Sequence, residues 1–254
     1  MKQILVMMVV VVLGQSVVAD EKPIADPIVE KAVRKKLKKP EGELTEADLE
    51  KVTRLDLHFT QITDTGLKDV AKLQKLTWLT LANNKITDEG LKEVAKLQKL
   101  ELLDLLNAKI TDTGLKEVAK LQKLEHLCLP GTKITDAGLK EVAKLQKLEG
   151  LILANTKITD EGLKEMAKLQ QLKRLGLQVT QVTDEGLKEM AKLEKLELLN
   201  LSGTKVTDAG LKEVVKIQKL TVLVLSNTKI TDAAVAELQK ALPNCKIYGP
   251  KSSP

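Results

Sequence analysis

The chain has 254 residues, a net charge of +6 and 43% apolar residues, which is enough to build a core. Its three aromatic residues are Phe59, Trp78 and Tyr248, so that core must be aliphatic. The basic excess does not indicate nucleic-acid binding. The lysines are interspersed with acidic residues, arginine occurs only three times, and aromatic residues for base stacking are scarce.

The first predicted element is an export signal. Lys2 precedes an uncharged apolar run over residues 4–13, and Val17 and Ala19 are small residues placed before a cleavage point. This pattern is typical of a secretory signal peptide, here residues 1–19, and it predicts a secreted or periplasmic protein. Its removal takes away the charge of Lys2, so that 6 − 1 leaves +5. The alternative is an uncleaved anchor, although the run is short for a bilayer span.

A capping helix and a linker are predicted over residues 20–43. Asp26 and Pro27 suit the N-cap and the first helical position, and Pro40 would end the helix. One apolar face would consist of Val29, Val33 and Leu37. We interpret this helix as a lid over the end of the following array. The alternative is that the lysines of its "RKKLKK" stretch attract an anionic surface.

A repeat of 24 residues dominates the rest of the chain. After a shortened unit at residues 44–61, seven units follow without insertion over residues 62–229. Each unit contains "LxxLxL", whose last two leucines alternate with other residues, as in a strand with one buried face. It also contains "GLKEVAKL" or a close variant, whose apolar spacing is typical of two helical turns with one buried face. Residues 230–248 would form a C-terminal cap, and residues 249–254 a frayed tail.

The start of each predicted helix carries a repeated "TD" pair, for example Thr87 and Asp88. Either side chain can cap the free N–H groups of the helix, and the aspartate also favours the positive end of the helix dipole. A glycine follows the aspartate two positions later in seven of eight cases. A small residue at that place predicts close packing between neighbouring coils.

Stacking is required because one strand and one helix cannot bury their own apolar faces. Strands at the same place in each coil must pair in parallel, about 4.8 Å apart, whereas packed helices need about 8–10 Å. The strand side is therefore the shorter, inner arc. The sequence predicts an α/β horseshoe solenoid in one domain, with a parallel sheet on the concave face and short helices on the convex face.

The unit "LxxLxLxxTKITDxGL" resembles leucine-rich repeat proteins over about residues 44–248, and the segment before it resembles the N-terminal cap of bacterial secreted members. Its "ITDxGL" part is similar to the cysteine-containing repeat variant. Threonine stands where that variant has cysteine, or where other variants have an asparagine ladder, at Thr132, Thr156, Thr180, Thr204 and Thr228. Asn84 keeps the asparagine. The resemblance implies the solenoid, but the family binds unrelated partners.

No catalytic centre is predicted. His58 and His126 fall on the first and fourth strands, about 14 Å apart and too far to share a metal. Asp56 and Asp104 would lie about 10 Å apart without a cleft, slightly wide for an inverting glycosidase. The chain also lacks a glycine-rich phosphate loop, HExxH and CxxC. We expect a non-enzyme without cofactors or metals, with a glycan hydrolase using Asp56 or Asp104 as an alternative.

A comparison of the repeats with one another selects one surface. The leucines, most of the lysines and "TD" barely vary, whereas the positions beside the strand leucines vary freely and would face the concavity. The candidate binding residues are Arg54, Asp56, Trp78, Thr80, Leu102, Asp104 and His126. The alternative explanation of this variation is drift at unrestrained positions.

The sequence thus predicts an exported, monomeric scaffold that binds a protein partner, and no nucleic acid, through its concave face. The alternative is an envelope-associated structural module whose lysine-rich convex face binds an anionic polymer or membrane.

Overall fold

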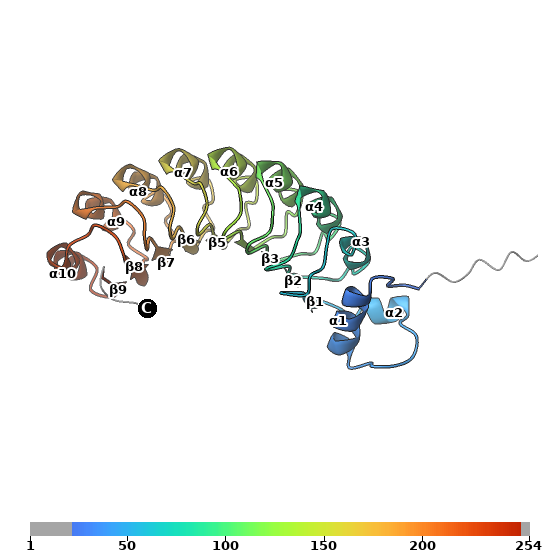
Figure 1. The fold of residues 1–254 in the computed structure, drawn as a ribbon. Helices are drawn as coiled ribbons and strands as arrows, with labels where there is room; N and C mark the ends of the chain where they lie inside the picture. Colours follow the sequence, from blue (N-terminus) through green and yellow to red (C-terminus); the bar gives the residue numbers. More distant parts are fainter. Residues whose placement is uncertain (1–21, 250–254) are drawn as a thin grey trace, which may run out of the picture.

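The computed structural model describes residues 22–249, so the predicted signal peptide at residues 1–19 lies outside the described part of the chain. The chain forms a curved solenoid in which the strands lie on the inner arc and the helices on the outer arc (Figure 1). The predicted fold class is confirmed. Its curvature follows from the smaller spacing of paired strands compared with packed helices.

One parallel sheet runs along the concave side, with its nine strands in chain order. They are β1 (Arg54–Asp56), β2 (Trp78–Thr80), β3 (Leu102–Asp104), β4 (His126–Cys128), β5 (Gly150–Ile152), β6 (Arg174–Gly176), β7 (Leu198–Asn200), β8 (Val222–Val224) and β9 (Lys246–Tyr248). Equivalent residues of the repeats pair directly, for example Leu79 with Leu103. The end of the predicted C-terminal cap at residues 230–248 extends the sheet, because β9 pairs with β8.

The helices line the convex side as one short element per coil (Figure 1). The convex helices are α3 (Leu67–Val70), α4 (Asp88–Val94), α5 (Asp112–Val118), α6 (Asp136–Val142), α7 (Asp160–Met166), α8 (Asp184–Met190), α9 (Leu211–Val214) and α10 (Asp232–Ala241). Two further helices, α1 (Pro27–Leu37) and α2 (Glu46–Leu49), lie at the N-terminal end (Figure 1). A short 3-10 turn, Asp208–Gly210, precedes α9.

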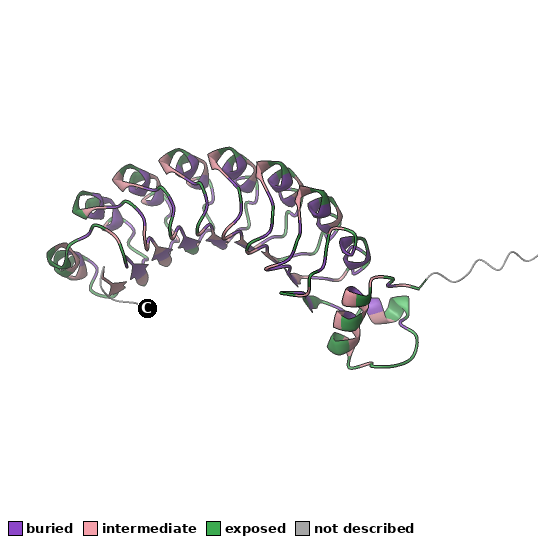
Figure 2. Ribbon diagram, in the orientation of Figure 1, coloured by how far each residue is buried: buried purple, intermediate pink, exposed green. Residues whose placement is uncertain are grey.

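The core is a continuous row of aliphatic side chains between the sheet and the helices, and Figure 2 shows the buried residues on the facing sides of both. The strand leucines contribute one wall, and Leu127 of β4 is 0% exposed. The helices contribute the other wall, for example Leu115 and Val118 of α5. Burial of each aliphatic side chain contributes roughly 1.5–3 kcal/mol relative to its exposed state, so every coil depends on its neighbours for stability.

The repeated Thr-Asp pair divides two tasks between its members. From Thr87 onwards the threonine is the N-cap; for example, the N–H of Thr113 donates to the Thr111 hydroxyl. The aspartate joins the next coil instead. Asp88 accepts from the backbone N–H of Thr111 at 2.8 Å and from its hydroxyl at 2.6 Å. The same pair of bonds recurs at every boundary from Asp64–Thr87 to Asp208–Thr231.

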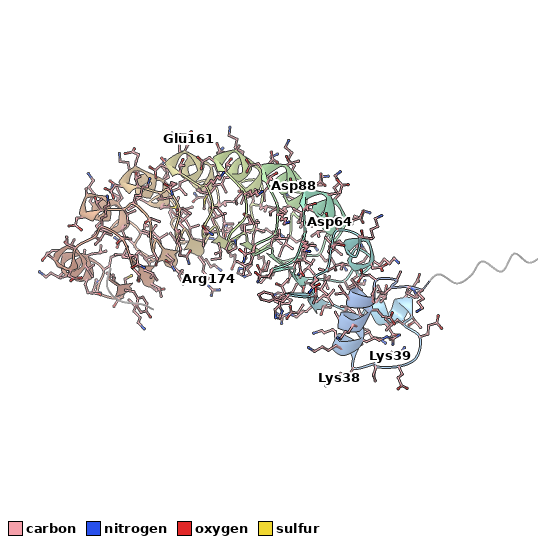
Figure 3. All side chains as sticks on the ribbon, in the orientation of Figure 1. Lys38, Lys39, Asp64, Asp88, Glu161 and Arg174 are labelled. Atoms are coloured by element: carbon pink, nitrogen blue, oxygen red, sulfur yellow. The ribbon has the colours of Figure 1, made fainter. Side chains whose placement is uncertain are left out.

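The glycine that follows this aspartate is explained by the same boundary. A Cβ atom on Gly90 would collide with the Asp64 carboxylate and with Leu67 of the preceding coil. Figure 3 shows Asp64 and Asp88 on the helix side of successive coils. The prediction of close packing between coils is therefore confirmed, and the glycine leaves room for the aspartate–threonine bonds.

The column that contains Asn84 and Thr132 is the place where a side-chain ladder would link the coils. Within residues 22–249, side chains of this column bond to another coil only at Asn84. The Asn84 amide donates to Leu57 O of the preceding coil at 2.7 Å. The threonines of that column donate to a carbonyl of their own coil, as Thr132 does to Leu129 O at 2.7 Å. The aspartate–threonine bonds therefore supply the side-chain link between coils that an asparagine ladder would otherwise supply.

At the N-terminal end, α1 packs on the first coil through Val29 and Val33, which are both 0% exposed. Asp26 caps the helix and Pro27 is its first residue, as predicted. The helix ends at Leu37 rather than immediately before Pro40, because Lys38 adopts a left-handed conformation with φ of 54°.

One residue of the first full coil fixes the segment before α1. Asp69 accepts from Ala25 N–H at 2.7 Å and from Asp26 N–H at 2.6 Å, and it pairs with Lys72 at 2.7 Å. The later full coils carry glutamate at this position, as in Glu93. Burial opposes ionisation of Asp69, but the hydrogen bonds from Lys72 and the two N–H groups outweigh it and lower its pKa. Asp69 thus anchors the N-terminal segment.

Candidate binding surface

The sheet register places the predicted residues on one face. The strand leucines point into the core, so the residues on either side of them point into the concavity. Two columns result on neighbouring strands. One contains Arg54, Trp78, Leu102 and His126, and the other Asp56, Thr80 and Asp104. Neighbouring side chains in such columns lie about 5 Å apart, which is close enough to form one patch.

Arg54 and Trp78 form the most specific contact of this patch. The guanidinium carbon of Arg54 lies 5.4 Å from the centroid of the Trp78 ring. Such a cation–π pair contributes about 0.5–1 kcal/mol at an exposed site. Arg54 is exposed and Trp78 is half-buried. The pair therefore presents a flat, partly apolar surface with a positive charge beside it.

The carboxylates beside this pair are held in place by local hydrogen bonds. Asp56 Oδ1 lies 2.5 Å from His58 Nδ1 and accepts from the His58 N–H at 3.1 Å. Burial acts to raise the pKa of Asp56, but the two His58 bonds and the charge of Lys35 lower it overall. Thr80 is only 5% exposed, and its hydroxyl donates to Asp104 Oδ2 at 3.2 Å. Thr80 thus positions Asp104 more than it offers a contact of its own.

The patch ends in the middle of the sheet. Leu102 and His126 are half-buried, and a Cβ atom on Gly150 would meet the His126 imidazole. The His126 ring therefore leans over the glycine of the next strand. Further along, Arg174 points to the concave side from β6 (Figure 3).

A groove lies between α1 and the first two strands, with a volume of about 860 Å³. The helix contributes Ile28, Lys31, Ala32, Lys35 and Lys36 to its wall, and the strands contribute Arg54, Asp56 and Trp78. The turn after β1 adds His58 and Phe59. Three of the seven predicted residues thus share a concave pocket with the capping helix.

Sequence reasoning missed Phe59, and it considered the "RKKLKK" lysines of α1 only as an alternative contact with an anionic surface, not as a wall of this groove. Phe59 is 71% exposed, and its φ of 52° lies in the left-handed region. The other seven residues of its column, all with positive φ, are Asn83, Asn107, Gly131, Asn155, Val179, Gly203 and Asn227. Asparagine and glycine tolerate this conformation, whereas phenylalanine and valine do not favour it. The sequence pattern that could have identified Phe59 is a phenylalanine in a column otherwise made mostly of asparagine and glycine.

Tyr248 was also missed as a concave residue, because β9 was not predicted to join the sheet. It pairs with Val224, and Lys246 Nζ lies 4.9 Å from the centroid of its ring. A cation–aromatic pair therefore stands near each end of the concave face.

The polar groups of residues 22–249 do not gather into a metal site, since no three or more His, Cys, Asp or Glu side chains are suitably placed. Burial and the charge of Asp104 raise the pKa of Cys128 to about 11, so its thiol stays protonated and is a poor nucleophile at neutral pH. No helix within the described residues is long and apolar enough to cross a membrane.

The family model "Leucine-rich repeat region" matches residues 47–190, and a second model, "Leucine Rich repeat", matches residues 192–215. The chain belongs to the leucine-rich repeat family. Among solved structures, internalin C2 from Listeria monocytogenes is 28% identical with a TM-score of 0.69, over 87% of this chain and 92% of that one. The internalin inlF of the same organism is 18% identical with a TM-score of 0.50, over 87% and 94%, and shares the fold. None of the curated proteins matches the chain.

Leucine-rich repeat solenoids use an extended concave surface for binding. The fold is therefore that of a protein-binding repeat module, a class that is typically non-catalytic.

Proposed function

We propose that the protein is an exported, monomeric, non-catalytic scaffold that binds a protein partner through its concave face, with Trp78 at the contact centre. The observation that carries this proposal is that the residues that are constant between repeats and the residues that vary lie in different parts of the fold. Leucines, glycines and aspartates that recur in each unit make the core and the boundaries between coils. The residues that vary between repeats lie beside one another on the concave face of the sheet.

The chemistry at the N-terminal end of that face also supports protein binding. Binding hot spots are enriched in tryptophan, tyrosine and arginine, and they favour partly enclosed places. Arg54 and Trp78 are such residues, and they line a groove. Export is supported by the signal-peptide pattern of residues 1–19.

The alternative, anion binding by convex lysines, is weakened by their partners. The second lysine of each helix repeat pairs with the acidic residue three positions before it, as Lys96 does with Glu93 at 2.7 Å. A second row of lysines supports the alternative. It includes Lys75, Lys99 and Lys123, which lie in the segments that lead from the helices to the strands. There, Lys75 and Lys123 lower the pKa of Lys99, because like charges disfavour its ammonium form.

The test is a comparison of wild-type protein with Trp78→Ala. Each would be immobilised and exposed to the envelope fraction of the producing organism, and the captured proteins identified and then measured by interferometry. Trp78→Ala should weaken binding of the partner by about 2 kcal/mol, which corresponds to a rise in Kd of roughly 30-fold and is typical of a hot spot. Val222→Ala, in the same column near the C-terminal end, is the matched control and should bind like wild type.

Salt separates the two candidates. Binding by lysine rows should fall steeply with ionic strength, whereas recognition around Trp78 should fall much less. Equal binding by wild type and Trp78→Ala, together with a steep salt dependence, would move the function to the lysines.

A further inference from the structure

We propose that the groove between α1 and the first two strands binds an acidic peptide segment of the partner that carries one apolar anchor side chain. This inference rests on the proposed function and assigns a chemistry to its partner. The groove joins a basic helix to an aromatic floor, and each of these features is unexplained by the fold itself.

The exposed phenylalanine is the first reason. Phe59 N–H donates to Ala82 O at 3.1 Å, which holds the turn in the conformation used by every coil. A residue other than glycine is strained in this left-handed conformation, because its Cβ lies too close to the following carbonyl oxygen. Asparagine would relieve part of that strain, and the next coil has Asn83 there. Phe59 is nevertheless retained with 71% of its surface exposed, in edge contact with His58 at a centroid distance of 5.9 Å. Strain of this kind is characteristic of functional sites.

The charge of the groove is the second reason. Its charged lining consists of four cations and one carboxylate: Lys31, Lys35, Lys36, Arg54 and Asp56. The carboxylate is already engaged by His58 at 2.5 Å. The Arg54 guanidinium lies over Trp78. A ligand that enters the groove therefore meets an excess of positive charge, which complements aspartate and glutamate side chains.

The wall that carries these lysines is fixed before any ligand arrives. Val29 and Val33 anchor α1 in the core, and Asp69 binds the two residues that lead into the helix. A preformed wall reduces the entropy lost on binding. The groove is thus a binding site as built, without closure of the capping helix.

The aromatic residues favour a peptide over an anionic polysaccharide. A polyanion would need only the lysines, and the exposed Lys38 that follows α1 is not part of the groove lining. Phe59 and Trp78 would contribute to binding of an apolar side chain, which an extended peptide can present between acidic residues. The groove volume of about 860 Å³ accommodates one such anchor with its flanking residues.

The test selects a displayed library of random twelve-residue peptides on the full chain, attached through its C-terminal end. Winning peptides, made synthetically and labelled with fluorescein, are then measured by fluorescence anisotropy. They should be rich in aspartate and glutamate around one large apolar residue. Phe59→Asn should weaken them about 10-fold or more, while the thermal midpoint stays the same or rises. Lys35→Gln with Lys36→Gln should weaken them by a similar factor at low salt and less at high salt.

Two controls accompany these variants. Val179→Asn makes the same kind of change at the other strained position, remote from the groove, and should leave binding unchanged. Lys140→Gln with Lys144→Gln removes the same charge from α6 and the turn after it, and should also leave binding unchanged. Heparin serves as the polyanion probe in place of the peptide.

Each other outcome overturns the inference in a recognisable way. The inference is refuted if the selected peptides are not enriched in acidic residues, or if their affinity is unchanged by Phe59→Asn. If winners depend on Arg174 instead, the contact lies further along the concave face, and the proposed function survives without the groove. If heparin binding needs the α1 lysines and no peptide is selected, the occupant is a polyanion. If binding needs only Lys140 and Lys144, both proposals fail.

Discussion

Replacing Asp69 with alanine should release the N-terminal cap. The carboxylate accepts two backbone N–H groups at 2.6–2.7 Å and lies 9% exposed. Hydrogen bonds to a charged group are worth about 1.5–3 kcal/mol each when well buried, and the pair with the half-exposed Lys72 adds little. Because the two donors are only partly buried, we take the lower end of that range and expect a loss of about 3 kcal/mol.

Glu93→Ala provides the matched control, since Glu93 occupies the same position one coil later and pairs with Lys96 on the surface. A surface pair is worth about 0–1 kcal/mol, so this variant should melt close to wild type. Urea unfolding followed by circular dichroism measures both, and amide exchange at residues 24–33 localises the effect. Equal losses in the two variants would refute the anchoring role of Asp69.

The same carboxylate sets a pH dependence. Its pKa is lowered in the folded state, so the stability it contributes is fully present above the unfolded value near 3.9 and is lost as pH falls through the folded value. The stability difference between wild type and Asp69→Asn should therefore be constant at neutral pH and shrink in acid. A difference that grows as the pH falls would contradict this.

Three further predictions concern the array. Leu127→Ala should lower the free energy of unfolding by about 2–5 kcal/mol, and Lys120→Ala on the outer face by no more than ~0.5 kcal/mol; similar values would mean that the faces are misassigned. Asp136→Ala removes two bonds to Thr159 and should cost about 2 kcal/mol in urea unfolding, whereas an unchanged midpoint would deny the link between coils. Val179→Asn should raise stability by ~1 kcal/mol by relieving left-handed strain, and a lower melting temperature would show that the valine packs.

The sequence predicted the solenoid and its faces because both follow from spacing. A 24-residue unit with a period-two segment and a helical segment allows few arrangements, and the strand leucines at positions such as Leu127 are buried as expected. The concave location of Arg54 and Trp78 followed from the same alternation.

Other features depended on contacts between coils, which periodicity does not contain. Either member of "TD" could cap a helix, and only the position of the next coil gives the aspartate its threonine partner. Asp69 differs from glutamate by one methylene group, and its role emerges once Ala25 lies against it. The ninth strand was missed because residues 246–248 lack the leucine pattern and are defined by pairing with β8.

The uniform boundary between coils has a consequence for how such a chain changes length. Because the aspartate, threonine and glycine are the same at each boundary from Asp64–Thr87 to Asp184–Thr207, a whole unit can be duplicated or deleted in the middle of the array without creating a new kind of junction. The first junction is not exchangeable in this way, since Asp69 belongs to it alone among the full coils. Each added unit would leave the N-terminal groove intact and move Tyr248 one strand spacing, about 4.8 Å, further from Trp78. The distance between the two cation–aromatic pairs is thus set by repeat number, and the recognition of one partner segment is separable from the reach to another.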